Sequence, residues 1–143
     1  MSIFSAREEL GERGDGAADA LRDDAEVDLL AHPPLDEPCV TLYVKHLLGW
    51  IAENPGAAGP IVIRPAEPLP NVGIGTKVVL DRYRDRITYG RVVYCLKAAC
   101  HLENAPNDTQ RIGTIDGRVH HSPCAFRITF SPRDVGVVIE HVC

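Results

Sequence analysis

The fold class of this chain is decided by the stretch AFRITF, residues 125–130. It places three large apolar residues, Phe126, Ile128 and Phe130, at alternate positions with polar residues between them. Successive side chains of a strand point to opposite faces of a sheet. The alternation therefore predicts a β-strand with one face in the core and the other toward solvent.

Working outward from this strand, apolar runs and turn residues predict further strands. They are expected over residues 61–63, over 76–80 continuing to 89, over 91–96 and over 135–142. Pro65, Pro68 and Pro70 restrict the first of them to a sheet edge or a loop. Asp116-Gly117 is a dipeptide that favours a tight hairpin turn. Together these features predict an α+β fold, mainly antiparallel β, built as a small barrel or sandwich over residues 39–143.

One or two helices are expected beside the strands. The segment from Val40 to Ile51 reads either as a strand that turns helical or as one buried helix, and the helical spacing of its apolar residues favours a helix over 42–53. A short helix over 17–31 is also plausible from its helix-forming residues. Alone in water that second helix would be marginal.

The charge of the chain is divided unevenly. Residues 1–38 carry eleven acids and three arginines, a formal −8, whereas residues 39–143 carry nine acids and twelve Lys or Arg, a formal +3. This pattern predicts an extended, intrinsically flexible acidic arm ahead of a mildly basic single globular domain. Such an arm is expected to contact something else.

Composition narrows where the chain is expected to work. The sequence holds no window of about 18 apolar residues and no basic, apolar leader at its start. Its five cysteines are odd in number and form no CxxC pair. These observations predict cytoplasmic synthesis without a signal peptide or transmembrane segment, with the thiols reduced.

The first candidate site is the run of arginines at 82, 84 and 86. On a strand, Arg82, Arg84 and Arg86 would share one face and could hold phosphates or a partner's carboxylates. Tyr83 would point to the other face, which weakens a nucleic-acid interpretation. The alternative without a binding role is a solvent-exposed hairpin end with Asp–Arg pairs. The alternatives are therefore a solvated surface, a protein partner or the chain's own acidic arm, and nucleic acid.

The second candidate site is a structural zinc site. Cys100, His101, His121 and Cys124 supply the thiolate and imidazole ligands that zinc takes in a tetrahedron. Their spacing is irregular, and a lone cysteine in a β core is commonly a small buried hydrophobe. Apart from this zinc, no cofactor is expected.

The third candidate is thiol catalysis. Cys124 with His120, or Cys100 with His141, could form a nucleophile–base pair if folding brought them together. The chain contains no nucleophile elbow, phosphate-binding loop or dinucleotide fingerprint. A non-enzymatic protein is the expectation.

These observations predict a structural or assembly protein whose β-rich body and N-terminal arm contact neighbouring subunits. A small β body with an extended arm is typical of capsid, connector or matrix proteins, so a virion or phage component is one reading. Its partners would be copies of itself or other protein subunits, ahead of nucleic acid. The alternatives are a small zinc-stabilised nucleic-acid or regulatory binding module, and a small Cys-dependent enzyme.

Overall fold

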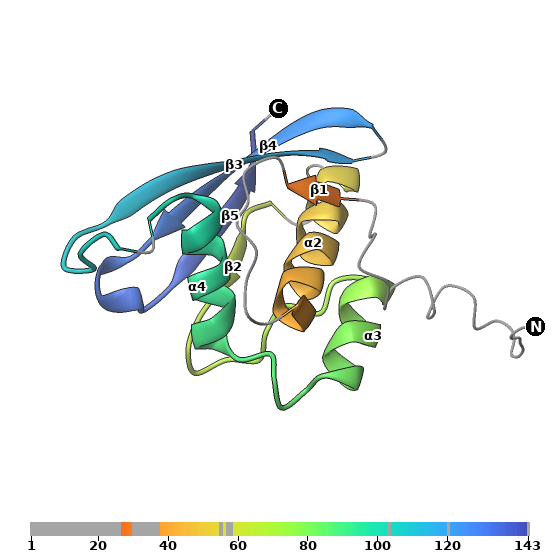
Figure 1. Cartoon of the computed structure of the whole chain (residues 1–143), viewed down its shortest axis with the longest axis horizontal. Helices are drawn as coiled ribbons and strands as arrows, with labels where there is room; N and C mark the ends of the chain where they lie inside the picture. The colour runs from red at the N-terminus through yellow and green to blue at the C-terminus, as the bar shows by residue number, and fades with distance from the viewer. Residues whose placement is uncertain are drawn as a thin grey trace, which may run out of the picture.

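The computed structural model describes residues 27–29, 38–54, 56, 59–102, 104–119 and 121–142, and these form an α+β fold (Figure 1). The helices are α2 (Pro38–Glu53), α3 (Ile74–Arg82) and α4 (Tyr89–Ala99). The strands are β1 (Val27–Leu29), β2 (Ile61–Ile63), β3 (Arg111–Val119), β4 (Ser122–Phe130) and β5 (Val137–His141). A short 3-10 helix, η1 (Pro132–Asp134), lies between β4 and β5.

The strands form one open sheet in the order β1-β3-β4-β5-β2, and every neighbouring pair is antiparallel. One face of this sheet is buried: Ile115, Phe126, Ile128 and Ile139 are fully covered. The alternate residues point to the other face and are largely exposed, as the burial patterns of β3 and β4 show. The core therefore lies between a single sheet and the helices.

Helix α2 is the centre of the core. Nine of its residues are buried, and they cover most of its circumference, as expected of a helix enclosed by other elements. The buried Tyr43 hydroxyl donates a hydrogen bond to the Pro70 carbonyl at 2.6 Å, which satisfies the polar end of an otherwise apolar side chain. α2 packs against α3, α4, β1 and β5.

Two glycines allow the start of α3 to approach α2 closely. A Cβ atom at Gly73 would lie 2.8 Å from Cδ1 of Trp50, and one at Gly75 would collide with the imidazole of His46. The Thr76 hydroxyl accepts hydrogen bonds from the N–H groups of Val72 and Gly73, both at 3.1 Å. The bond from Gly73, the N-cap residue of α3, satisfies a donor that a helix leaves unpaired at its start, and the bond from Val72 fixes the residue before it.

The prediction of strands over 76–96 is wrong, because these residues form most of α3 and α4 and the turn between them. Val79 of α3 is fully buried, and so are Val92 and Leu96, which lie four residues apart in α4. The Thr88 hydroxyl accepts a hydrogen bond from the Arg91 N–H at 3.3 Å and so caps α4. Packing against α2 and this cap outweigh the β preference of the valines.

The predictions of a small barrel or sandwich and of one or two helices are also wrong, because residues expected to form strands are helical. The described part of the chain therefore holds three helices beside one open sheet and no second sheet, with α3 packed against α2. The Asp116-Gly117 hairpin turn is also wrong. Both residues lie inside β3, and the β3–β4 ladder ends where Val119 pairs with Ser122.

Several sequence predictions are confirmed. The strand over 61–63 is β2 at the edge of the sheet, the alternating stretch 125–130 lies in β4, and the last strand is β5. The helix over 42–53 lies within α2, which begins earlier because Pro38 suits the first position of a helix. None of the described helices combines the length and hydrophobicity needed to cross a bilayer.

The predicted arm, residues 1–38, lies mostly outside the described residues. Within it, Val27–Leu29 forms β1 and pairs with residues 117–119 of β3. This part of the stretch 17–31 is therefore a strand, where the sequence favoured a helix. The remainder of that predicted helix lies outside the described residues.

Candidate functional site

The segment between α3 and α4 is a folded turn that projects charged residues outward. The N–H groups of Arg86 and Ile87 both donate to the Tyr83 carbonyl, at 2.9 and 3.1 Å. Ile87 is 4% exposed and anchors the turn in the core. The polar residues on either side of Ile87 consequently face solvent, including Arg84 and Arg86.

Positive charge is concentrated in this part of the molecule. Residues 74–97 carry six Lys or Arg and two Asp, a formal +4, although residues 39–143 as a whole carry only +3. We call the exposed cluster of Arg82, Arg84, Arg86 and Arg91 the basic turn. It is the region of the body where cations most outnumber acids.

Two acids, Asp81 and Asp85, lie in or beside the basic turn and offset only part of its charge. Asp81 is shared between Lys77, at 3.4 Å, and Arg84, at 3.2 Å, in exposed pairs that are weak in water. Neither Arg82 nor Arg86 has an acidic partner within the described residues. Their guanidinium groups therefore remain available to an anionic partner.

The N-terminal half of α4 continues this surface. Its first turn contains no acidic residue, so the positive end of the helix dipole is uncompensated. Arg91 donates through Nη1 to the Arg86 carbonyl at 3.0 Å, which ties the helix to the turn. Tyr94, one helical turn from Arg91 and 56% exposed, presents an aromatic ring on the same face.

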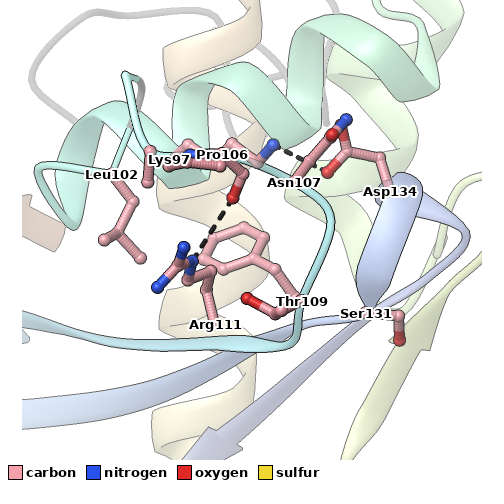
Figure 2. A pocket seen from close by; sticks show the side chains of 10 residues that line it. Lys97, Leu102, Pro106, Asn107, Thr109, Arg111, Ser131 and Asp134 are labelled. Carbon is pink, nitrogen blue, oxygen red and sulfur yellow. Dashed lines mark hydrogen bonds and ion pairs between the residues drawn. The ribbon is translucent and has the colours of Figure 1, made fainter.

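The C-terminal half of α4 is held in place by side chains from three segments (Figure 2). Nζ of Lys97 lies 2.7 Å from Oδ1 of Asp134, and Asn107 donates through Nδ2 to Oδ2 of Asp134 at 3.3 Å. Burial raises the pKa of Asp134, but the bonds from Lys97 and Asn107 and the charge of Lys97 lower it more. The net result is a pKa below the usual value, as expected of a paired carboxylate.

The backbone around Asp134 is strained and is held by hydrogen bonds from other segments. Arg133 and Asp134 have φ values of 59° and 56°, in the left-handed region that disfavours residues with a Cβ. The Tyr89 hydroxyl donates to the Asp134 carbonyl at 2.6 Å, and the Arg133 N–H donates to the Asn107 carbonyl. We call Lys97, Asn107 and Asp134, with Tyr89, the clamp. The adjoining cavity of about 10 Å³ has room for about one water molecule, so the clamp positions α4 and offers no space for a ligand.

A larger cavity, of about 210 Å³, lies at the other end of the sheet. Its lining includes Trp50, Asn54, Glu140 and His141. The Glu140 carboxylate is already held by Arg127, whose Nε and Nη2 both lie 2.9 Å from Oε1. The cavity therefore lacks an unpaired charge from this carboxylate.

The three arginines singled out in the sequence do lie together, but not on a strand. Arg82 is the last residue of α3, while Arg84 and Arg86 lie in the turn after it. Tyr83 packs against the core. The signals that sequence reasoning missed are the cap at Thr88 and the apolar spacing that makes α4 a helix, because both identify Arg91 and Tyr94 as outward-facing.

The four residues predicted to bind zinc are not gathered. Cys100 packs against Gly113 of β3, whereas Cys124 pairs with Gly117 of the same strand. Four residues along a strand separate positions by about 13 Å. His101 and His121 are exposed, and no group of three or more metal-binding side chains occurs in the described part of the chain.

Neither Cys100 nor Cys124, the two thiols considered for catalysis, lies in an environment that activates a thiol, and the buried Cys95 is similar. Burial raises the pKa of Cys100 to about 12, the opposite of the change that activates a nucleophile. Burial likewise raises the pKa of Cys95 to about 12, against a smaller opposing effect of a hydrogen bond with Thr41. Cys124 is buried in β4, and its proposed partner His120 lies outside the described residues.

Comparison of the chain with models of known families, with curated proteins and with solved structures gives no match. A function must therefore be inferred from the chain's own geometry.

Proposed function

We propose that this protein binds duplex DNA through the basic turn and the N-terminal half of α4. The observation that supports this proposal is the cluster of exposed arginines at the start of an exposed helix face, of which Arg82 and Arg86 have no acidic partner within the described residues. Arginine is suited both to phosphate oxygens and to the O6 and N7 atoms of guanine. The major groove is wide enough to admit an α-helix.

The order of elements also supports this proposal by analogy. Two helices joined by a turn, with the second helix presenting its N-terminal residues, is the arrangement of helix–turn–helix DNA-binding proteins. Here α3 and α4 are joined by the six residues 83–88, a longer connection than the usual three or four. The analogy concerns architecture alone, and the charge distribution carries the argument.

Duplex DNA is favoured over single-stranded nucleic acid by the aromatic residues. Single-strand binding surfaces stack successive bases on several aromatic side chains. On this surface Tyr94 is strongly exposed, while Tyr83 and Tyr89 are partly buried and packed against the core. One exposed ring suits an edge or methyl contact in a groove better than a stacking platform.

The test is the salt dependence of binding to a mixed-sequence duplex, measured by fluorescence anisotropy with the full chain. Each phosphate contact contributes about 0.9 to the slope of log K against log salt. The triple variant Arg82→Gln, Arg84→Gln, Arg86→Gln should lower that slope by about 2 to 3. The matched control replaces three exposed arginines elsewhere, Arg64, Arg118 and Arg127, by Gln.

We expect the control variant to keep the wild-type slope. Equal slopes for the two triple variants would contradict the proposed surface, and no binding of the full chain at low salt would contradict the function itself. Tyr94→Ala should weaken binding without changing the salt slope, because Tyr94 carries no charge. Tyr94→Phe separates a contact of the ring from one of the hydroxyl.

Assembly into a larger structure is a second candidate function, favoured by the exposed face of the sheet. Ile112, Thr129, Val138 and Val62 are cross-strand neighbours in one row across four strands. Ile112 is 59% exposed and Val62 is 39% exposed. Such a row could pack against the same row of another copy.

Native mass spectrometry of the full chain tests this second candidate. An oligomer that dissociates on Ile112→Lys, but not on Ile74→Lys at a position of α3 that is 70% exposed, would support it. A monomer at all concentrations would exclude it.

A further inference from the structure

We propose that residues 1–26 of this chain occupy the basic turn and compete there with DNA. This inference rests on the proposed function, because it concerns regulation of the same surface. The segment carries eight acids and three arginines, a formal −5. It ends at Val27, which is fixed to the sheet by its pairing with Val119.

Charge complementarity identifies the basic turn as the surface that this segment fits. Arg82 and Arg86 lack acidic partners among the described residues, and Arg84 shares Asp81 with Lys77. The exposed face of β3 and β4 offers fewer such groups, because it carries Arg118 and Arg127 and Arg127 is already held by Glu140. An acidic segment therefore gains most at the basic turn, where its carboxylates meet unpaired guanidinium groups.

The length of the segment allows this contact. Twenty-six residues span at most about 90 Å when fully extended, and a domain of this size has a radius of gyration of about 13 Å. Attachment at Val27 also makes the contact intramolecular, which gives an effective concentration in the millimolar range for a short tether. Even a weak ionic contact is then populated at low salt.

The test uses the full chain with the eight acids of residues 1–26 replaced by the corresponding amides. A control of the same kind, which removes three charges, replaces the exposed acids Glu67, Asp108 and Asp116 of the body by their amides. At 50 mM salt we expect the arm variant to bind the duplex on the order of tenfold more tightly than the wild type. The control should change affinity less than twofold.

A second measurement separates occupation of the turn from simple repulsion of DNA by the acids. Without DNA, backbone amide NMR signals of residues 82–91 should differ between the wild type and the arm variant. That difference should disappear in the Arg82→Gln, Arg86→Gln background. Unchanged signals at residues 82–91 would overturn the proposal, even if the affinity rises.

The outcomes also distinguish this proposal from the proposed function. If neither wild type nor arm variant binds the duplex, the function fails, while the NMR comparison still tests the contact. If both bind equally well, the competition is wrong and the DNA-binding function stands. Shifts at residues 82–91 that grow with protein concentration would place another copy's segment on the turn and overturn the intramolecular contact.

Discussion

The two halves of α4 are built for different tasks. The N-terminal half begins at a cap, exposes Arg91 and Tyr94, and has no acid in its first turn. The C-terminal half places Lys97, whose side chain is 15% exposed, on Asp134 beneath a strained backbone turn. The same helix thus carries one cation, Lys97, that is paired with the clamp carboxylate, and a second, Arg91, that is exposed at the surface. Position relative to the core, not residue type, separates the two roles.

The largest expected effect comes from breaking the clamped half. Lys97→Met keeps the aliphatic length of the side chain but leaves the partly buried Asp134 carboxylate without its cation. We expect a loss of about 2 kcal/mol in the free energy of unfolding, measured by urea denaturation. Lys77→Met is the control, because its pair with Asp81 is 64% and 52% exposed and should contribute less than about 0.5 kcal/mol. Equal effects of the two substitutions would contradict the difference between the halves.

The same ion pair should make stability depend on pH in acid. The folded-state pKa of Asp134 is lowered from its ordinary value of 3.8. Burial raises this pKa, but the hydrogen bonds from Lys97 and Asn107 and the positive charge of Lys97 lower it more. Because the folded pKa is lowered, the ionised Asp134 contributes fully to the free energy of unfolding above a pH of about 4. This contribution is lost as the pH falls through the folded pKa. Urea midpoints below pH 4 should therefore differ less between wild type and Asp134→Asn than midpoints at pH 7.

A smaller effect is expected at the capped end. Thr88→Ala removes the acceptor for the Arg91 N–H and should destabilise the fold by about 1 kcal/mol. Thr88→Ser keeps the acceptor and should be close to wild type. Because the cap orients the start of α4, Thr88→Ala should also weaken DNA binding, whereas Lys97→Met should leave affinity nearly unchanged at temperatures where the variant is folded. Thermal melts and anisotropy measure the two quantities.

The smallest effect concerns the strained turn of the clamp. Arg133 is exposed and has φ of 59°, a conformation that glycine adopts without penalty. Arg133→Gly should stabilise the protein by about 0.5 kcal/mol, the balance of relieved strain and greater freedom of the unfolded chain. Arg133→Ala keeps the Cβ and should give no gain. A gain from alanine would show that the arginine side chain, and not the backbone, was unfavourable.

The elements predicted from sequence were those with one dominant signal. The alternation of Phe126, Ile128 and Phe130 identified β4, since a period of two leaves no helical alternative. Residues 76–96 carried two signals, β-branched valines and helical spacing, and the prediction followed the weaker one. The Asp116-Gly117 pair was taken for a turn, but the strand continues through it and Gly117 faces Cys124.

The candidate site was predictable in part. Arg82, Arg84 and Arg86 were visible as a charge run, although their placement on a strand was wrong. The clamp was beyond sequence reasoning because Lys97, Asn107 and Asp134 come from three segments, and only the packing of α4 on the β4–β5 connection brings them together. Tyr94 became a candidate only once α4 was known to be a helix.

The most direct test of the central claim is an NMR titration of the labelled full chain with a short mixed-sequence duplex at low salt. The proposed function predicts that the perturbed amides fall in residues 82–94, with the sheet residues 112, 129 and 138 unaffected. Perturbations centred on the sheet, or none at a duplex concentration of several hundred micromolar, would contradict it.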